Sequence, residues 1–164
     1  MKNRSILALT LCVALGGQAL LAGLGSKKAS YVGGTWTTLA AEAEGTLDVS
    51  DSSKALFRVD KGGVFEIPFD RITSLEYGQK AGRRVGSTIA LGVTTLGIGA
   101  LPMLFSKKRK HYLSVGYKDA DGKDAGVVLE LGKDITRPTL KVFEVRSGKK
   151  IEYESDEAKK HVGN

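Results

Sequence analysis

The chain of 164 residues has one cysteine, two histidines and few aromatic side chains (7%). The single thiol, Cys12, excludes an internal disulfide and a metal site built from several cysteines. His111 and His161 lack the spacing of metal ligands, and no GxSxG nucleophile elbow occurs. We therefore expect that the protein is not an enzyme and has no cofactor, and that His111 is solvated beside a basic run.

Two short motifs could be taken for ligand sites. Residues 119–122 (DADG) would suit a calcium loop, but its first and last ligand positions would fall on Tyr117 and Val128, which cannot supply the oxygens. Residues 92–97 have the glycine spacing of a phosphate-binding loop, but Ile98 stands where the lysine is needed. We expect a hairpin turn at 119–122 and no metal site.

The N-terminus has the features of a secretory signal. Two basic residues precede an uncharged run at residues 5–24, which is the order of a basic n-region and an apolar h-region. Small residues allow cleavage after Ala19 or after Gly25, but neither is a strong Ala-x-Ala site. Residues 1–25 are therefore expected to be a signal peptide or an uncleaved anchor, and the protein to be exported to the periplasm or the periplasmic face of a membrane.

Positive charge is in excess, with 25 Lys and Arg against 18 Asp and Glu, a net charge of +7. A basic surface favours anionic partners such as phospholipid headgroups, nucleic acid or acidic proteins. Nucleic acid is not expected, because export removes the protein from it and the strands lack interleaved basic and aromatic residues. No small-molecule substrate is evident.

Apolar and polar residues alternate in short segments through much of the chain, which predicts β-strands separated by turns. The four strands that precede Gly78 are spaced near ten residues apart and indicate an antiparallel meander, in which Pro68 ends a strand or places it at an edge. Glu66, Asp70 and Glu76 are expected in turns or on outward strand faces. The expected strands are a first strand or arm within 27–45, then 45–49, 54–59, 64–67 and 72–77, and later 113–117 and 127–131.

A helix is predicted after the last of these strands. Asp134 is the expected N-cap, and Gly148 follows the last turn at about Ser147. Apolar residues at i, i+4, i+7 and i+8 give the helix one face that can cover a sheet. Residues 149–153 are expected to add a last short strand, and 154–164 to form a charged flexible tail.

Residues 85–105 form an uncharged run of 21 residues between two groups of predicted strands. As a helix it would be about 31 Å long, enough to cross a bilayer core of about 30 Å. A single crossing would separate the strands before it from those after it. We therefore favour a helical or hairpin-like insertion that begins and ends on one side, with a true transmembrane helix in an inner-membrane protein as the alternative.

The order of about six or seven antiparallel strands and one amphipathic helix resembles the pleckstrin-homology-like (PH-like) superfold, nearest its GRAM-type and bacterial versions. The resemblance rests on GTLDVSDSSKALFRVDKGGVFEIPFDRITSLEYG, on HYLSVGYKDADGKDAGVVLELGKD and on the helix after them. The motifs YVGGT, IPFDRITSLEYG and LFSKKRKHYL are also similar to an uncharacterised family of exported bacterial proteins.

This resemblance implies an α+β, mainly β fold: a PH-like antiparallel barrel or sandwich over residues 29–153, with a C-terminal capping helix and the apolar insertion 85–105 between strands. It implies no activity, because the superfold hosts lipid binding, peptide binding and structural roles.

Two functions are compatible with these features. The first is a non-catalytic cell-envelope module that binds membrane lipid headgroups, and the second is a structural or interaction domain that docks an envelope protein. Apolar contact with the membrane or the partner is expected from Ile89, Leu91, Val93, Leu96, Ile98, Leu101, Met103, Leu104 and Phe105. Headgroup binding is expected from Arg83, Arg84, Lys107, Lys108, Arg109 and Lys110, at about 1 kcal/mol for each basic side chain.

Overall fold

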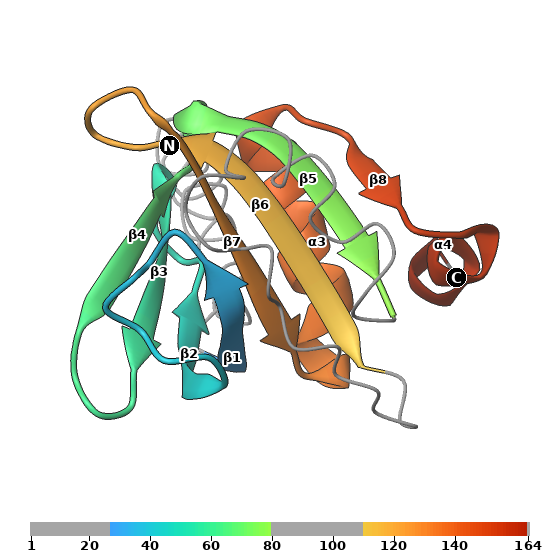
Figure 1. Cartoon of the computed structure of the whole chain (residues 1–164). Coiled ribbons are helices and arrows are strands. Elements are labelled where there is room, and N and C mark those ends of the chain that lie inside the picture. The colour runs from blue at the N-terminus through green and yellow to red at the C-terminus, as the bar shows by residue number, and fades with distance from the viewer. Residues whose placement is uncertain (1–26, 80–109, 164) are drawn as a thin grey trace, which may run out of the picture.

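A computed structural model describes residues 27–79 and 110–163 of the chain. Within them, eight strands form one sheet in the order β4-β3-β2-β1-β7-β6-β5-β8, and α3 lies across the back of β5 and β6 (Figure 1). The elements are β1 (Lys27–Gly34), β2 (Ala43–Asp48), β3 (Lys54–Val59), β4 (Val64–Pro68), the 3-10 turn η1 (Phe69–Arg71), β5 (Ile72–Gly78), β6 (His111–Lys118), β7 (Asp124–Leu131), α3 (Lys133–Ser147), β8 (Ile151–Tyr153) and α4 (Asp156–Gly163).

Two antiparallel meanders make up most of this sheet. Strands β1 to β4 form the first and β5 to β7 the second, and antiparallel pairing of β1 with β7 joins them at Tyr31 and Leu129. The short strand β8 adds to the edge of β5 in parallel. The sheet is therefore mixed, and the expected α+β, mainly β fold class is confirmed.

One part of the expected meander is wrong, because β5 does not pair with β4. Pro68 ends β4 and has no N–H with which to continue the ladder. The chain then turns through η1, where Phe69 is 2% exposed and its ring meets Phe143 of α3 edge-on, with centroids 5.4 Å apart. Burial of Phe69 under α3 thus carries the chain away from β4, which is left as an edge strand of the sheet.

An aromatic cluster between the two meanders surrounds Trp36, which lies in the turn after β1. Its ring stacks on those of Tyr31, Phe57 and Phe65, with centroids 5.4, 5.9 and 4.8 Å away. Its Nε1 donates a hydrogen bond of 2.8 Å to the hydroxyl of Tyr117 at the end of β6. This cluster packs the first meander onto the second.

Helix α3 begins two residues earlier than predicted, with Gly132 rather than Asp134 at its N-cap. The Gly132 carbonyl accepts hydrogen bonds from the N–H groups of Ile135 and Thr136, so Asp134 falls within the first turn. The helix ends as expected at a left-handed Gly148. Its predicted sheet-covering face is confirmed, with Ile135, Thr136, Thr139, Leu140 and Phe143 buried.

The C-terminal residues differ from the flexible tail that the sequence suggested. After β8, residues Asp156–Gly163 form α4. The Ser155 hydroxyl accepts a hydrogen bond from the N–H of Ala158, as an N-cap does, and the Ala158 side chain is 1% exposed. The cap, the buried Ala158 and the partly buried Val162 attach this helix to the fold.

Candidate functional site

The apolar and headgroup-binding positions predicted from the sequence lie outside the described residues, except for Lys110. The signal peptide and the insertion at 85–105 lie outside them as well. In residues 27–79 and 110–163, no helix is long and apolar enough to cross a membrane. The described fold instead shows where the chain leaves for residues 80–109 and where it returns.

The departure and return points lie side by side at one end of the sheet. Gly78, the last residue of β5, pairs with Tyr112 of β6. One row further, His111 of β6 pairs with Leu131 of β7, which in turn pairs with Ala29 of β1. We call this end of the sheet, where β5 ends and β6 begins, the root.

Basic residues follow directly beyond that row. Lys27 and Lys28 precede Ala29, Lys110 precedes His111, and Lys133 begins α3 just after Leu131. Lys110 is already engaged, since its ammonium lies 2.8 Å from a carboxylate oxygen of Glu130, and this hydrogen bond raises the pKa of Lys110. The root is thus rich in cations, although the one predicted headgroup residue within the described part is held by an internal ion pair.

His111 is not solvated, contrary to the expectation from its basic neighbours. It is 6% exposed, and a hydrogen bond of 2.7 Å joins its Nδ1 to the hydroxyl of the fully buried Tyr77. Burial raises the pKa of Tyr77. Glu76 is likewise buried rather than outward-facing, at 8% exposure. The Tyr77–His111 pair ties β5 to β6 where the chain leaves the sheet.

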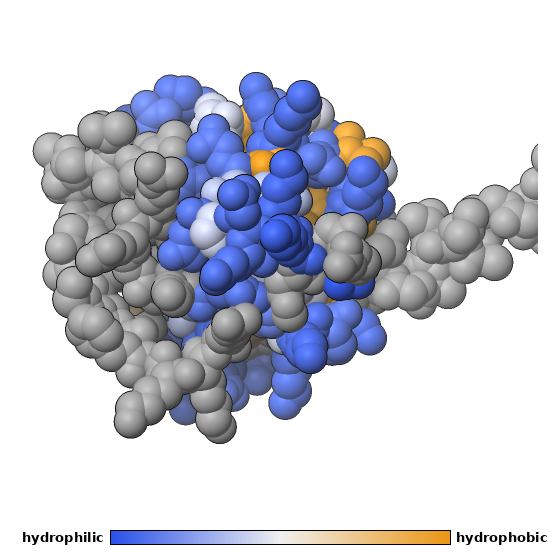
Figure 2. Space-filling model, turned by 90° about the vertical axis from the view of Figure 1, so that its right-hand side faces the viewer, coloured by the Kyte–Doolittle hydropathy of each residue, from blue (hydrophilic) through white to orange (hydrophobic). Residues whose placement is uncertain are grey.

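A hollow of about 720 Å³ opens beside this pair, where the first turns of α3 and the end of α4 approach the start of β6. It is lined by His111, Lys133, Asp134, Thr136, Arg137 and Val162. Two cations and one carboxylate leave its rim with a small excess of positive charge. The face of the molecule on the side of β8 and α4 is predominantly hydrophilic where it is not covered by grey atoms (Figure 2).

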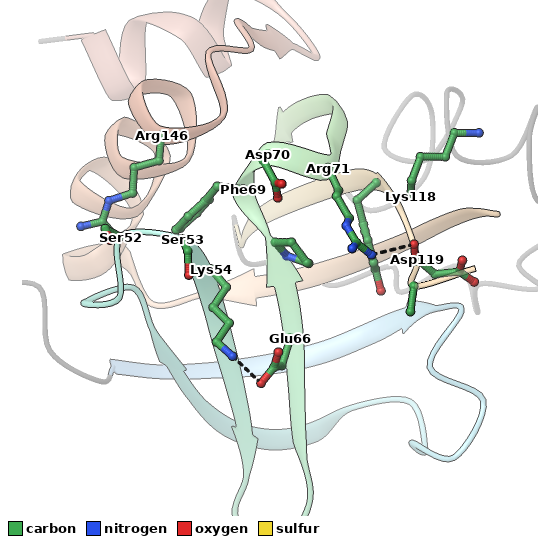
Figure 3. Close-up of a pocket in the computed structure, with 13 residues that line it drawn as sticks. Ser52, Ser53, Lys54, Glu66, Phe69, Asp70, Arg71, Lys118, Asp119 and Arg146 are labelled. Atoms are coloured by element: carbon green, nitrogen blue, oxygen red, sulfur yellow. Dashed lines mark hydrogen bonds and ion pairs between the residues drawn. The ribbon is translucent and has the colours of Figure 1, made fainter. Parts of the chain in front are cut away.

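A second hollow, of about 680 Å³, lies among the β2–β3 turn, η1, the β6–β7 turn and the last turn of α3 (Figure 3). Its basic side chains have partners within the fold. Lys54 Nζ lies 2.9 Å from a carboxylate oxygen of Glu66, and Arg71 Nη1 donates a 3.0 Å hydrogen bond to the carbonyl of Asp119. Lys54 and Arg71 are therefore engaged in contacts within the fold.

Arg146 completes the wall of the second hollow. Its guanidinium donates hydrogen bonds to the carbonyls of Val49 and Asp51 and lies 5.4 Å from the ring centroid of Phe69. It therefore fastens the C-terminal end of α3 to the β2–β3 turn and to η1. The DADG turn between β6 and β7 is also structural, because its first carboxylate accepts two backbone N–H bonds within the turn.

The exposed cations at the root, Lys27, Lys28 and Lys133, are of the type that attracts anionic groups. No group of three or more His, Cys, Asp or Glu side chains in residues 27–79 and 110–163 is placed to hold a metal ion. The burial of His111 could have been read from its sequence, since it stands two residues before Leu113 and shares the inward parity of Leu113 and Val115. No sequence signal gave its pairing with Tyr77, which depends on the register between β5 and β6.

Comparison with known proteins adds no relative: no protein-family profile matches the chain, and no curated protein is similar to it.

Proposed function

We propose that the protein is a non-catalytic cell-envelope module that is exported and associates with a membrane through residues 85–105. The observation that carries this proposal is the pairing of Gly78 with Tyr112. The chain enters and leaves the intervening segment through neighbouring strands of one sheet. This supports an insertion that begins and ends on the same side of a membrane, since a single crossing would have to separate β5 from β6.

The composition of the segment supplies the physical reason for membrane contact. Twenty-one successive residues without a charge must be covered by the fold, by a partner or by lipid, because exposed apolar surface of that size is unfavourable in water. Basic residues stand on both sides of the run, and the root adds Lys27 and Lys28 from β1 and Lys133 from α3. A bilayer of anionic lipid can cover the uncharged run with its apolar interior and attract the basic residues with its negative headgroups.

We also propose that the scaffold is a PH-like barrel. Two antiparallel meanders joined by β1 and β7, followed by a helix packed on η1 and β5, support this assignment. In such a scaffold the strands and α3 hold the root rigid, while the segment between β5 and β6 makes the contact with the membrane.

Deletion of residues 89–104 tests the proposal. We expect the exported deletion variant to move from the membrane fraction to the soluble periplasmic fraction, whereas a variant with charge-conserving changes in the β3–β4 turn should stay with the membrane. Trp36 emission checks that the domain is still folded. Unchanged membrane partitioning of a folded deletion variant would refute the proposal.

The same deletion separates this function from docking of an envelope protein. A protein-docking domain would co-purify with a specific partner in detergent, lose that partner on deletion and be indifferent to the anionic lipid content of vesicles. Binding that requires a protein partner and ignores lipid charge would therefore contradict the membrane proposal.

A further inference from the structure

The side of the sheet opposite α3 is buried, although it is not part of the hydrophobic core. In β6, Leu113 and Val115 point into the core, so the residues between and beside them point outward. These outward residues are nonetheless covered, since Tyr112 is 2% exposed and Ser114 is 1% exposed. Val128 of β7 pairs with Ser114 and is 2% exposed. We call this side of β6 and β7 the outer face, with the members Tyr112, Ser114, Gly116, Gly126 and Val128.

The strands cannot cover this face by themselves. Side chains stand roughly perpendicular to a sheet, so neighbours on one face shield each other's flanks and leave the ends open. Gly116 and Gly126 pair beside Ser114 and have no side chain to shield it. Of the described helices, α3 contacts η1, β5 and β6 from the core side, and α4 contacts β8. The layer over Ser114 is therefore supplied by neither of these helices.

The environment of the outer face is apolar. The Ser114 hydroxyl is buried and has no hydrogen-bond partner in the part of the chain that the structure describes. At a wet surface, water would bond this hydroxyl, and a polar layer over it would bring a donor or an acceptor. Burial also raises the pKa of the neighbouring Tyr112. The face therefore suits an apolar, uncharged occupant.

The chain's own uncharged run is tethered at the edge of this face. The chain leaves the sheet after Gly78, which pairs with Tyr112 of the outer face. Residues 79–84, six in number, can reach about 20 Å. The distance from β5 across β6 to β7 is only about 10 Å. Residues 85–105 thus begin within reach of every part of the outer face.

The return of the chain includes a direct contact with this side of the sheet. Lys110 stands two residues before Tyr112, and its ammonium lies 2.8 Å from a carboxylate oxygen of Glu130. Glu130 is the partner of Tyr112 in the pairing of β6 with β7. The last residue before β6 is therefore held against the outer side of the sheet, which directs the chain over the outer face.

We propose that the outer face is the docking site of residues 85–105 of the same chain when these residues are not in contact with a membrane. Docking covers the face and the uncharged run together, so that neither is exposed to water. The inference rests on the proposed function, because it gives one segment two alternative partners, the sheet and the bilayer. Membrane association then requires the segment to leave the outer face, and stronger docking lowers the apparent affinity for lipid.

Thiol protection at Ser114 tests the docking without any lipid. Every variant also carries Cys12→Ser, which removes the one native thiol. Ser114→Cys places a thiol under the proposed segment, and the control Val115→Cys places one beside it on the core side. Deletion of residues 89–104 should speed the reaction of Ser114→Cys with a maleimide by at least about tenfold and leave Val115→Cys protected. Trp36 emission checks folding, and equal protection of Ser114→Cys with and without the segment would overturn the proposal.

A second measurement keeps the chain at full length and does not depend on the folding of the deletion variant. Ser114→Cys is combined with a cysteine at each of residues 89–104 in turn. Oxidation should form a disulfide within one chain at some of these positions, and none when the exposed Ser52→Cys replaces Ser114→Cys. The same yield from both would overturn the proposal.

The cross-linked chain also tests whether the sheet and the bilayer compete for the segment. Its binding is measured on vesicles of phosphatidylcholine and phosphatidylglycerol. The oxidised form should bind at least about tenfold more weakly than the reduced form, because the segment cannot leave the outer face. Equal binding of the two forms would overturn the proposal that the two partners are alternatives.

Further outcomes identify another occupant or separate the docking from the proposed function. Disulfides between two chains would assign the face to a second copy, and loss of protection on removal of residues 1–25 would assign it to the N-terminal run; both overturn the docking. A deletion variant that leaves the membrane while Ser114→Cys stays protected refutes the docking alone. A deletion variant that stays with the membrane while Ser114→Cys becomes reactive supports the docking and refutes the proposed function.

Discussion

Replacement of Tyr117 by phenylalanine probes the contact that locks the first meander to the second. The change removes one oxygen and leaves the ring in place, so it creates almost no cavity. Tyr117 is 5% exposed, and its hydroxyl accepts the 2.8 Å hydrogen bond from Trp36 Nε1. In the variant, the indole N–H remains buried, at a residue 8% exposed, and loses this acceptor.

The cost can be worked out from these contacts. A buried donor left without a partner costs about 1–3 kcal/mol, because its hydration was already given up on folding. We therefore expect Tyr117→Phe to lower the free energy of unfolding by about 2 kcal/mol. For a chain of this size that corresponds to a fall in Tm of about 6 °C.

Urea titration followed by Trp36 fluorescence measures this loss, since Trp36 is the single tryptophan and is buried in the folded state. The matched control is Tyr112→Phe. Tyr112 is 2% exposed, but its hydroxyl has no hydrogen-bond partner among the described residues. The control should change the free energy of unfolding by less than about 0.5 kcal/mol. Equal losses for the two variants would show that the Trp36 hydrogen bond does not stabilise the fold.

Two further predictions concern acid stability and backbone packing. Hydrogen bonds from Ser50, with a smaller contribution from Arg58, lower the pKa of Asp48 from 3.8 to about 2. The stability that this shift confers is complete above pH about 4 and is lost as the pH falls toward 2. Asp48→Asn should therefore flatten the pH dependence of the free energy of unfolding in that window by roughly 1 kcal/mol, measured by urea titration at each pH. Gly34→Ala should cost about 3 kcal/mol or more by thermal denaturation, because the new Cβ would lie 2.2 Å from the carbonyl oxygen of Gly126 at a φ of +147°. Gly122→Ala, at a φ of +76° with no atom within 4 Å, should cost only about 1 kcal/mol, and a similar loss at both glycines would contradict the close-approach argument.

Local features of the sequence predicted most individual elements correctly. The β6–β7 hairpin follows from alternating apolar residues around a DADG turn, and α3 follows from its apolar spacing and from Gly148. The pairing of Tyr31 with Leu129 joins strands about a hundred residues apart in the chain, and no local pattern specifies it. The sequence pattern wrongly predicted that β5 pairs with β4 for the same reason. Their separation depends on burial of Phe69 under α3, which lies more than sixty residues further along the chain.

Most of the candidate site stays a prediction, because its residues lie outside the described part of the chain. The sequence predicts charged and apolar contact residues in and around 85–105, and Lys110 is the one among them within the described part. The contact of His111 with Tyr77 depends on the register between β5 and β6, which no local pattern specifies.

The order of strands also determines how the sheet can meet a second copy of itself. Its two edges are β4 and β8, at opposite margins of the sheet (Figure 1). β4 has five residues, ends in a proline and carries the exposed Glu66, while β8 has three residues and is followed at once by α4. Short strands with a charge or a proline are poor templates for intermolecular strand pairing. Sheet extension and aggregation through these edges are therefore disfavoured, even though the chain carries a long uncharged run elsewhere.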